Sequence, residues 1–160
     1  MNPNKTLITT VALFAAMFVG TAALAHTDED LDTQTAPHGG QLRMAGIYHY
    51  ELVVTKNSPE ARDNPILVYV TDHAGVKIPT LGASGTVTLL SGKTKATVTL
   101  TPDGDNLMKG VGKYASTPDM KAVVSITLAG KAAEQARFTP LAPPAPSAPI
   151  RNEHSTHNKH

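Results

Sequence analysis

The sequence predicts an all-β protein, and three observations support that prediction. Short runs rich in β-branched residues recur between residues 47 and 138. Glycine, aspartate, serine and threonine turns separate most of these runs. No convincing amphipathic helix lies among them. We therefore expect an immunoglobulin-like antiparallel β-sandwich of about seven strands with flexible tails, and a small barrel is the alternative.

The first 25 residues have the pattern of a secretory signal peptide. Lys5 gives the positive start, residues 7–24 are mostly apolar, and Ala23-Leu24-Ala25 matches an A-x-A cleavage site. We expect cleavage after Ala25, export to the periplasm and no membrane attachment afterwards. Residues 26–36 (HTDEDLDTQTA) are acidic and polar, so we expect a flexible acidic lead-in.

Residues 37–139 are expected to form the β-sandwich domain. The predicted strands cover residues 47–55, 66–71, 85–91, 95–101, 107–111, 122–129 and 132–138. The strands at 85–91 (GTVTLLS) and 95–101 (KATVTLT) alternate strictly, and the four residues 91–94 (SGKT) predict a hairpin turn. The inward positions are expected to be Leu52, Val54, Leu67, Tyr69, Val87, Leu89, Val98, Leu100, Val124, Ile126, Leu128 and Phe138.

The tail, residues 140–160, begins with five prolines between positions 140 and 150. This composition predicts an extended spacer followed by a disordered end. His154, His157 and His160 are spaced by three in that end, which would allow a weak, adaptable chelate or a solvated tail without a ligand.

The composition excludes several classes of function. Removal of Lys5 with the signal leaves 13 basic and 13 acidic side chains, so there is no electrostatic case for nucleic acid. The chain has no cysteine, which excludes disulfides and thiolate metal sites. It also lacks a nucleophile elbow and a phosphate loop, and we do not expect an enzyme.

Histidine placement is the main functional signal. Neutral imidazole is the commonest protein ligand for zinc, copper and nickel. In residues 47–54, Tyr48 lies on the apolar face, whereas His49 and Glu51 share the other face roughly 6.5–7 Å apart. Such a pair could reach a common ion, or it could be an exposed polar pair on an open sheet face.

His38 lies in an H-G-G segment that precedes this strand. If the chain folds back at Gly46, residues 38–42 lie alongside residues 50–54, and the imidazole could reach Glu51 or His49. Alternatively His38 is a loop residue, and the two glycines following it simply form a bend. His38, His49 and Glu51 are the best candidate metal ligands.

The stretch PHGGQLRMAGIYHYELVV, followed by VYVTDHAG, resembles the small β domain of CzcB-like heavy-metal efflux periplasmic adaptors and related stand-alone periplasmic proteins. The resemblance spans about residues 37–138. It implies periplasmic binding of zinc, cobalt, nickel or copper, with His38 and Glu51 carried over by motif position. The chain lacks the adaptors' long helical hairpin and lipoyl-like segments, so the resemblance implies an accessory role beside an efflux pump or adaptor.

Two further histidines are candidates. His73 lies in Asp72-His73-Ala74-Gly75, a sequence that predicts a turn with glycine in the left-handed conformation, and it is a weaker candidate ligand. His26 would become the mature N-terminus, where its amine and imidazole could chelate copper(II). That arrangement resembles CopC-like copper carriers.

We therefore expect a periplasmic protein that binds a divalent transition metal and buffers it or delivers it to a heavy-metal efflux system. Two alternatives remain open. One is a metal-independent periplasmic protein-interaction module, and the other is a copper carrier that uses His26.

Overall fold

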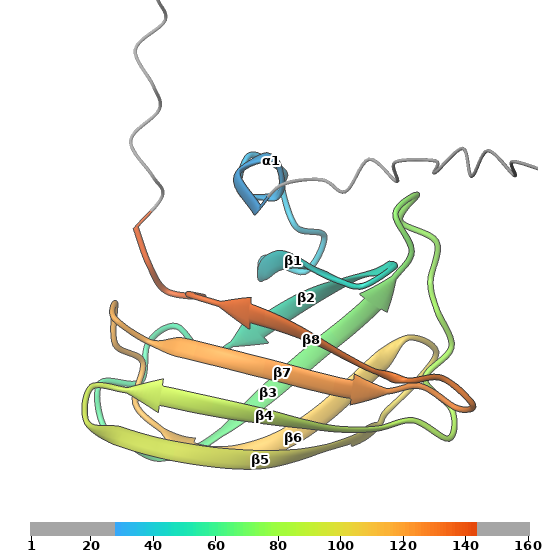
Figure 1. Cartoon of the computed structure of the whole chain (residues 1–160). Coiled ribbons are helices and arrows are strands. Elements are labelled where there is room, and N and C mark those ends of the chain that lie inside the picture. The colour runs from blue at the N-terminus through green and yellow to red at the C-terminus, as the bar shows by residue number, and fades with distance from the viewer. Residues whose placement is uncertain (1–27, 144–160) are drawn as a thin grey trace, which may run out of the picture.

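The computed structural model describes residues 28–143, so the predictions for the signal peptide, for His26 and for the tail from residue 144 onward fall outside the described residues. A short helix, α1 (Asp28–Asp32), precedes the strands (Figure 1). The strands are β1 (Gln41–Ala45), β2 (Tyr48–Val54), β3 (Arg62–Thr71), β4 (Ser84–Ser91), β5 (Thr94–Pro102), β6 (Leu107–Tyr114), β7 (Lys121–Thr127) and β8 (Ala133–Phe138).

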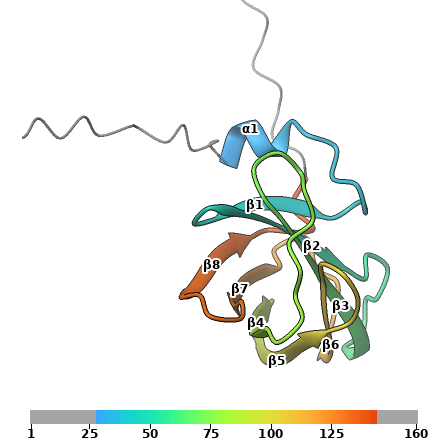
Figure 2. The same ribbon diagram turned by 90° about the vertical axis from the view of Figure 1, so that its right-hand side faces the viewer.

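These strands form one antiparallel sheet in the order β1-β2-β3-β6-β5-β4-β7-β8. Between β5 and β6 only Thr101 and Pro102 pair, opposite Lys109 and Met108, so the sheet bends sharply there. At the other edge β1 and β8 lie next to each other, which makes the sheet nearly barrel-shaped (Figure 2). The predicted all-β, antiparallel class is confirmed. The immunoglobulin-like sandwich is not.

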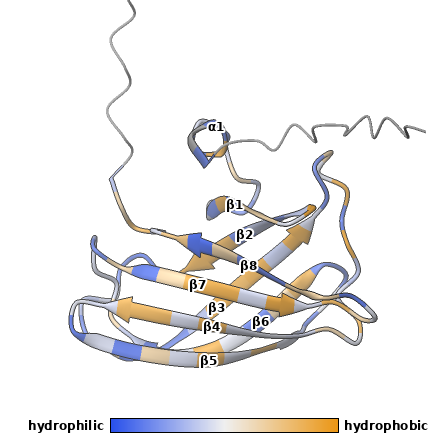
Figure 3. Cartoon of the chain, in the orientation of Figure 1, coloured by the Kyte–Doolittle hydropathy of each residue, from blue (hydrophilic) through white to orange (hydrophobic). Residues whose placement is uncertain are grey.

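One apolar core fills the space enclosed by the curved sheet, and the hydrophobic stretches of the strands contribute to it (Figure 3). The even-numbered residues 48–54 of β2 are buried in it, as alternation predicts. Leu89, Leu100 and Ile126 from β4, β5 and β7 are almost completely buried there as well. Burial of each such side chain contributes roughly 1.5–3 kcal/mol to folding.

Strand β3 faces the core differently from the prediction. Ile66, Val68 and Val70 are fully buried, whereas Leu67 and Tyr69 are partly exposed on the other face. The run from position 66 to position 70 is apolar throughout, so its sequence carries no alternation that could distinguish the two faces. The prediction that Leu67 and Tyr69 point inward was therefore wrong, and Tyr69 becomes available to the outer face.

The segment expected to be a flexible lead-in contains α1 and packs on the domain. Leu31 is 1% exposed. The guanidinium of Arg43 on β1 donates to both carboxylate oxygens of Asp32, at 2.6 and 3.2 Å. One buried leucine and one bidentate ion pair thus order a segment whose composition alone predicts disorder. Within residues 28–143, no helix has the length and apolar character needed to cross a bilayer.

Candidate functional site

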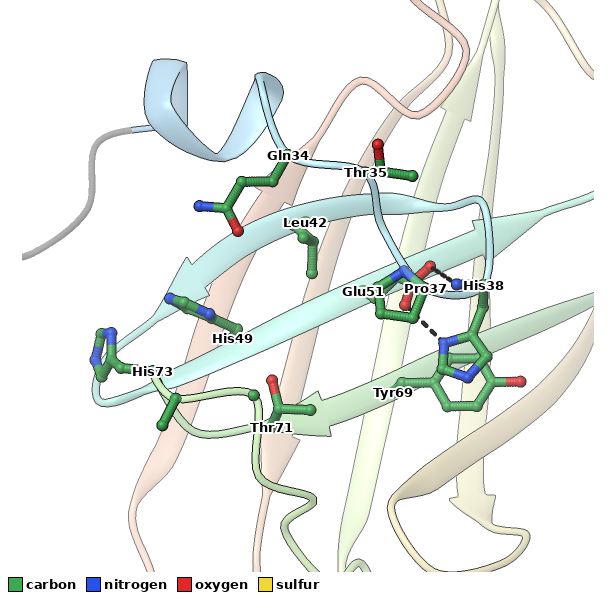
Figure 4. Close-up of a pocket in the computed structure, with 12 residues that line it drawn as sticks. Gln34, Thr35, Pro37, His38, Leu42, His49, Glu51, Tyr69, Thr71 and His73 are labelled. Carbon is green, nitrogen blue, oxygen red and sulfur yellow. Dashed lines mark hydrogen bonds and ion pairs between the residues drawn. The ribbon is translucent and has the colours of Figure 1, made fainter.

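A pocket of about 280 Å³ lies over the outer face of β2, beside β1 and β3 (Figure 4). The chain between α1 and β1 forms one wall of it, and the turn after β3 forms another. This covering explains why His49 and Glu51 are only 7% and 3% exposed, although alternation places them on the outer face. The lining residues are Gln34, Thr35, Pro37, His38, Leu42, His49, Glu51, Tyr69, Thr71, His73, Ala74 and Gly75.

The H-G-G segment reaches this pocket because the chain folds back at Gly46, which is the first of the two alternatives that the sequence left open. Strands β1 and β2 pair in antiparallel register with Leu42 opposite Glu51. Residues 38–40, which immediately precede β1, are thereby brought beside Glu51. The backbone pairing of a five-residue strand therefore determines which acidic side chain His38 meets.

Glu51 binds this segment through both oxygens of its carboxylate. Oε1 accepts hydrogen bonds from the backbone N–H groups of His38 and Gly40, at 2.8 and 3.0 Å. Oε2 lies 2.7 Å from Nδ1 of His38. Hydrogen bonds to an ionised group are stronger than those between neutral groups, so one buried carboxylate holds the loop at three points.

The two glycines of the loop are required for different reasons. Gly39 has a φ of +72°, a backbone conformation that residues with a side chain rarely adopt, but a Cβ there would meet no atom within 4 Å. Gly40 has no positive φ, yet its Cβ would lie 2.4 Å from the backbone oxygen of Leu52. Gly39 therefore permits the turn, and Gly40 permits the close approach to β2.

Tyr69 supports the imidazole of His38 from β3. The two ring centres are 3.5 Å apart, and the ring planes differ by only 4°, so the rings are stacked face to face. His38 itself remains accessible, with 42% of its side chain exposed. Tyr69 was expected in the core, and nothing in an unbroken apolar run could have placed it on the pocket side.

His49 and His73 meet at the opposite end of the pocket, away from His38 (Figure 4). Their ring centres are 4.7 Å apart, and the rings are nearly perpendicular, at 73°. The predicted turn positions His73. Oδ1 of Asp72 accepts from the N–H groups of Ala74 and Val76, both at 2.8 Å, and Gly75 has a φ of +79°. The turn chemistry and the pocket position of His73 are thus compatible.

The structure brings four of the five predicted ligand residues to one pocket, but it divides them into two pairs. His38 lies with Glu51, and His49 lies with His73. Among residues 28–143 no group of three or more histidine, aspartate or glutamate side chains is arranged to hold a metal ion. His38, His49 and Glu51 are therefore not arranged to bind a single ion together. The assignment of metal ligands stays a prediction.

Comparisons with known proteins add no identification. No family model matches the chain, and neither the curated proteins nor the solved structures contain a match. The likeness to CzcB-like adaptors therefore rests on the quoted motifs alone.

Proposed function

We propose that this chain is a periplasmic accessory protein that binds a divalent transition metal in the pocket and buffers it or passes it to a heavy-metal efflux system. One observation carries the proposal. Three histidines from separate parts of the chain, His38, His49 and His73, line the same small cavity. The motif resemblance and the signal-like N-terminus support the cellular setting.

The donor set favours particular metals. Imidazole suits zinc, copper, nickel and cobalt, whereas calcium and magnesium prefer oxygen ligands. Because the chain has no cysteine, thiolate ligation is excluded. The site therefore belongs to the imidazole class, and its affinity should weaken at acidic pH as the rings become protonated.

The spacing of His49 and His73 suits two ligands of one ion. With metal–nitrogen bonds of about 2.0–2.1 Å, two imidazoles on one ion place their ring centres roughly 4.5 Å apart when the bonds meet at a right angle and roughly 5.2 Å apart at the tetrahedral angle. The observed separation of 4.7 Å falls in that range.

Two protein ligands leave coordination positions for water or for a donor from another molecule. Such a site holds its ion less tightly than a closed site with four protein ligands. An open, exchangeable site fits buffering or delivery better than it fits a permanent structural metal. This is why we propose an accessory role and no structural role for the ion.

The test is titration of zinc into the purified mature chain by calorimetry. The substitutions H154A/H157A/H160A remove the three imidazoles of the tail, which would otherwise compete for zinc, and this triple variant is the background for the test. There, His73→Ala should weaken zinc binding at least about tenfold, equivalent to about 1.4 kcal/mol. Gln34→Ala, which changes the same pocket without removing an imidazole, is the matched control and should bind like the background. Equal zinc affinity in His73→Ala and in the background would contradict the proposed site.

The alternative, a metal-independent interaction module, is favoured by a different observation. Ile47, Val76 and Leu81 are large apolar residues that are 67%, 59% and 85% exposed, in the turns that follow β1 and β3. Pull-down from a periplasmic extract with and without a chelator separates the two functions. Chelator-insensitive capture of a defined partner, together with no zinc uptake, would favour the interaction module.

A further inference from the structure

The contacts of Glu51 leave it unsuited to be a metal ligand itself. Both of its oxygens contact the loop. Oε1 accepts two hydrogen bonds from backbone N–H groups, and Oε2 contacts the ring of His38. The residue is 3% exposed. These three contacts occupy most of the roughly four acceptor sites of the carboxylate, so an ion bound there would compete with the hydrogen bonds that hold the loop. The role of Glu51 must therefore be sought in what it does to His38.

An ionised carboxylate has only acceptor sites, so the ring nitrogen that it contacts must carry a hydrogen. Nδ1 of His38 is that nitrogen, at 2.7 Å from Oε2. In a neutral imidazole the other nitrogen, Nε2, then has the free lone pair. Stacking on Tyr69 fixes the plane of the ring as well. Tautomer and orientation of His38 are thus both determined by neighbouring side chains.

We infer that Glu51 is a positioning residue that presents Nε2 of His38 as a second metal-binding point, separate from His49 and His73. The inference rests on the proposed function. Histidines that bind metals almost always donate their other ring N–H to a carboxylate or carbonyl, and this is the arrangement that Glu51 and His38 form. Water or a donor from another molecule completes the coordination of the ion there. This point provides one protein nitrogen, so it binds more weakly than the His49–His73 pair.

Glu51→Gln separates positioning from loop structure. The amide oxygen of glutamine can still accept from the backbone N–H groups of His38 and Gly40. Its NH2 group, however, can only donate to Nδ1, which forces the hydrogen of the ring to Nε2. The ring would then present a donor where a metal needs a lone pair. Glu60→Gln is the matched control, because Glu60 carries the same exchange of carboxylate for amide on an exposed side chain in the loop between β2 and β3.

The experiment is nitrogen-15 NMR of the histidine side chains in the full mature chain at neutral pH, first without metal and then during zinc titration. We expect the Nδ1–H tautomer of His38 in the wild type and in Glu60→Gln, and the Nε2–H tautomer in Glu51→Gln. Zinc should shift Nε2 of His38 in the first two proteins. In Glu51→Gln the zinc concentration needed for this shift should rise about 10–100-fold, whereas the responses of His49 and His73 should persist.

Two results would overturn the inference. One is an Nε2–H tautomer of His38 in the wild type, a result that does not depend on whether Glu51→Gln folds. The other is an equal zinc response of His38 in the wild type and in Glu51→Gln. Failure of the proposed function looks different, because His49 and His73 would then show no response to zinc even in the wild type.

Discussion

The adjacent glycines of the H-G-G segment allow a sharp test of how the loop is held. Substitution Gly40→Ala places a Cβ 2.4 Å from the oxygen of Leu52 and 2.9 Å from Cγ2 of Val53. A backbone oxygen in a paired strand cannot retreat, so the loop must move outward by several tenths of an ångström. That movement breaks or lengthens the 3.0 Å hydrogen bond from Gly40 to Glu51.

The expected cost follows from the bond that is lost. A hydrogen bond to a charged group contributes about 1.5–3 kcal/mol, and some strain remains in the displaced loop. We therefore expect Gly40→Ala to lower the free energy of unfolding by about 2–4 kcal/mol. Gly39→Ala meets no atoms but must adopt φ of +72°, which costs roughly 1–2 kcal/mol. Gly39→Asn should cost less than Gly39→Ala, because asparagine tolerates this conformation better.

Urea unfolding followed by circular dichroism measures these differences, provided that the three variants keep the wild-type dependence on urea. The diagnostic quantity is the order of the variants, with Gly40→Ala the least stable and Gly39→Asn the nearest to wild type. A Gly40→Ala protein that is as stable as Gly39→Ala would refute the close approach of the loop to β2.

Three further predictions concern the core and α1. The hydroxyl of the fully buried Tyr50 has no hydrogen-bond partner among the described residues, so Tyr50→Phe should raise the free energy of unfolding by about 1 kcal/mol. Tyr114→Phe loses hydrogen bonds to the N–H of Thr55 and the carbonyl oxygen of Pro65, so it should lower the free energy of unfolding by about 1–3 kcal/mol. Chemical denaturation of the two variants measures both changes. Burial, and secondarily the charge of Glu134, raises the pKa of Tyr50. The folded state therefore keeps a proton that the unfolded state loses above about pH 10, and stability should fall there by up to about 1.4 kcal/mol per pH unit, less steeply in Tyr50→Phe; an unchanged slope in that variant would contradict this assignment. Asp32→Asn weakens the ion pair with Arg43 and should speed amide hydrogen exchange in α1 while leaving β4 and β7 protected; uniform exchange changes would argue against a local role.

Local pattern was sufficient for much of the fold. Strands with alternating sequence, such as β4 and β5, fall close to their predicted bounds, because burial of one face imposes a period of two. The sequence offered a fold-back at Gly46 as one of two alternatives, and in the structure the fold-back brings His38 to Glu51. Strand β1, which makes this pairing possible, was not among the predicted strands. These features depend on residues that are near in sequence.

The rest depends on packing between distant segments. The alternating pattern of β2 predicts that its outer face is exposed to solvent, yet the segment after α1 covers that face. Tyr69 was assigned to the core, and its stacking on His38 depends on which face of an all-apolar run points inward. The pairing of His49 with His73 requires the register of β2 with β3, where His49 lies opposite Thr71. No spacing within the sequence encodes that neighbourhood.

The central claim, that the imidazoles of the pocket bind a transition metal, is tested most directly by anomalous X-ray diffraction at the zinc absorption edge from crystals of the zinc-loaded protein. We expect a peak between the rings of His49 and His73, with zinc–nitrogen distances of about 2.0–2.1 Å. Anomalous density confined to other parts of the chain, with none in this pocket, would contradict it.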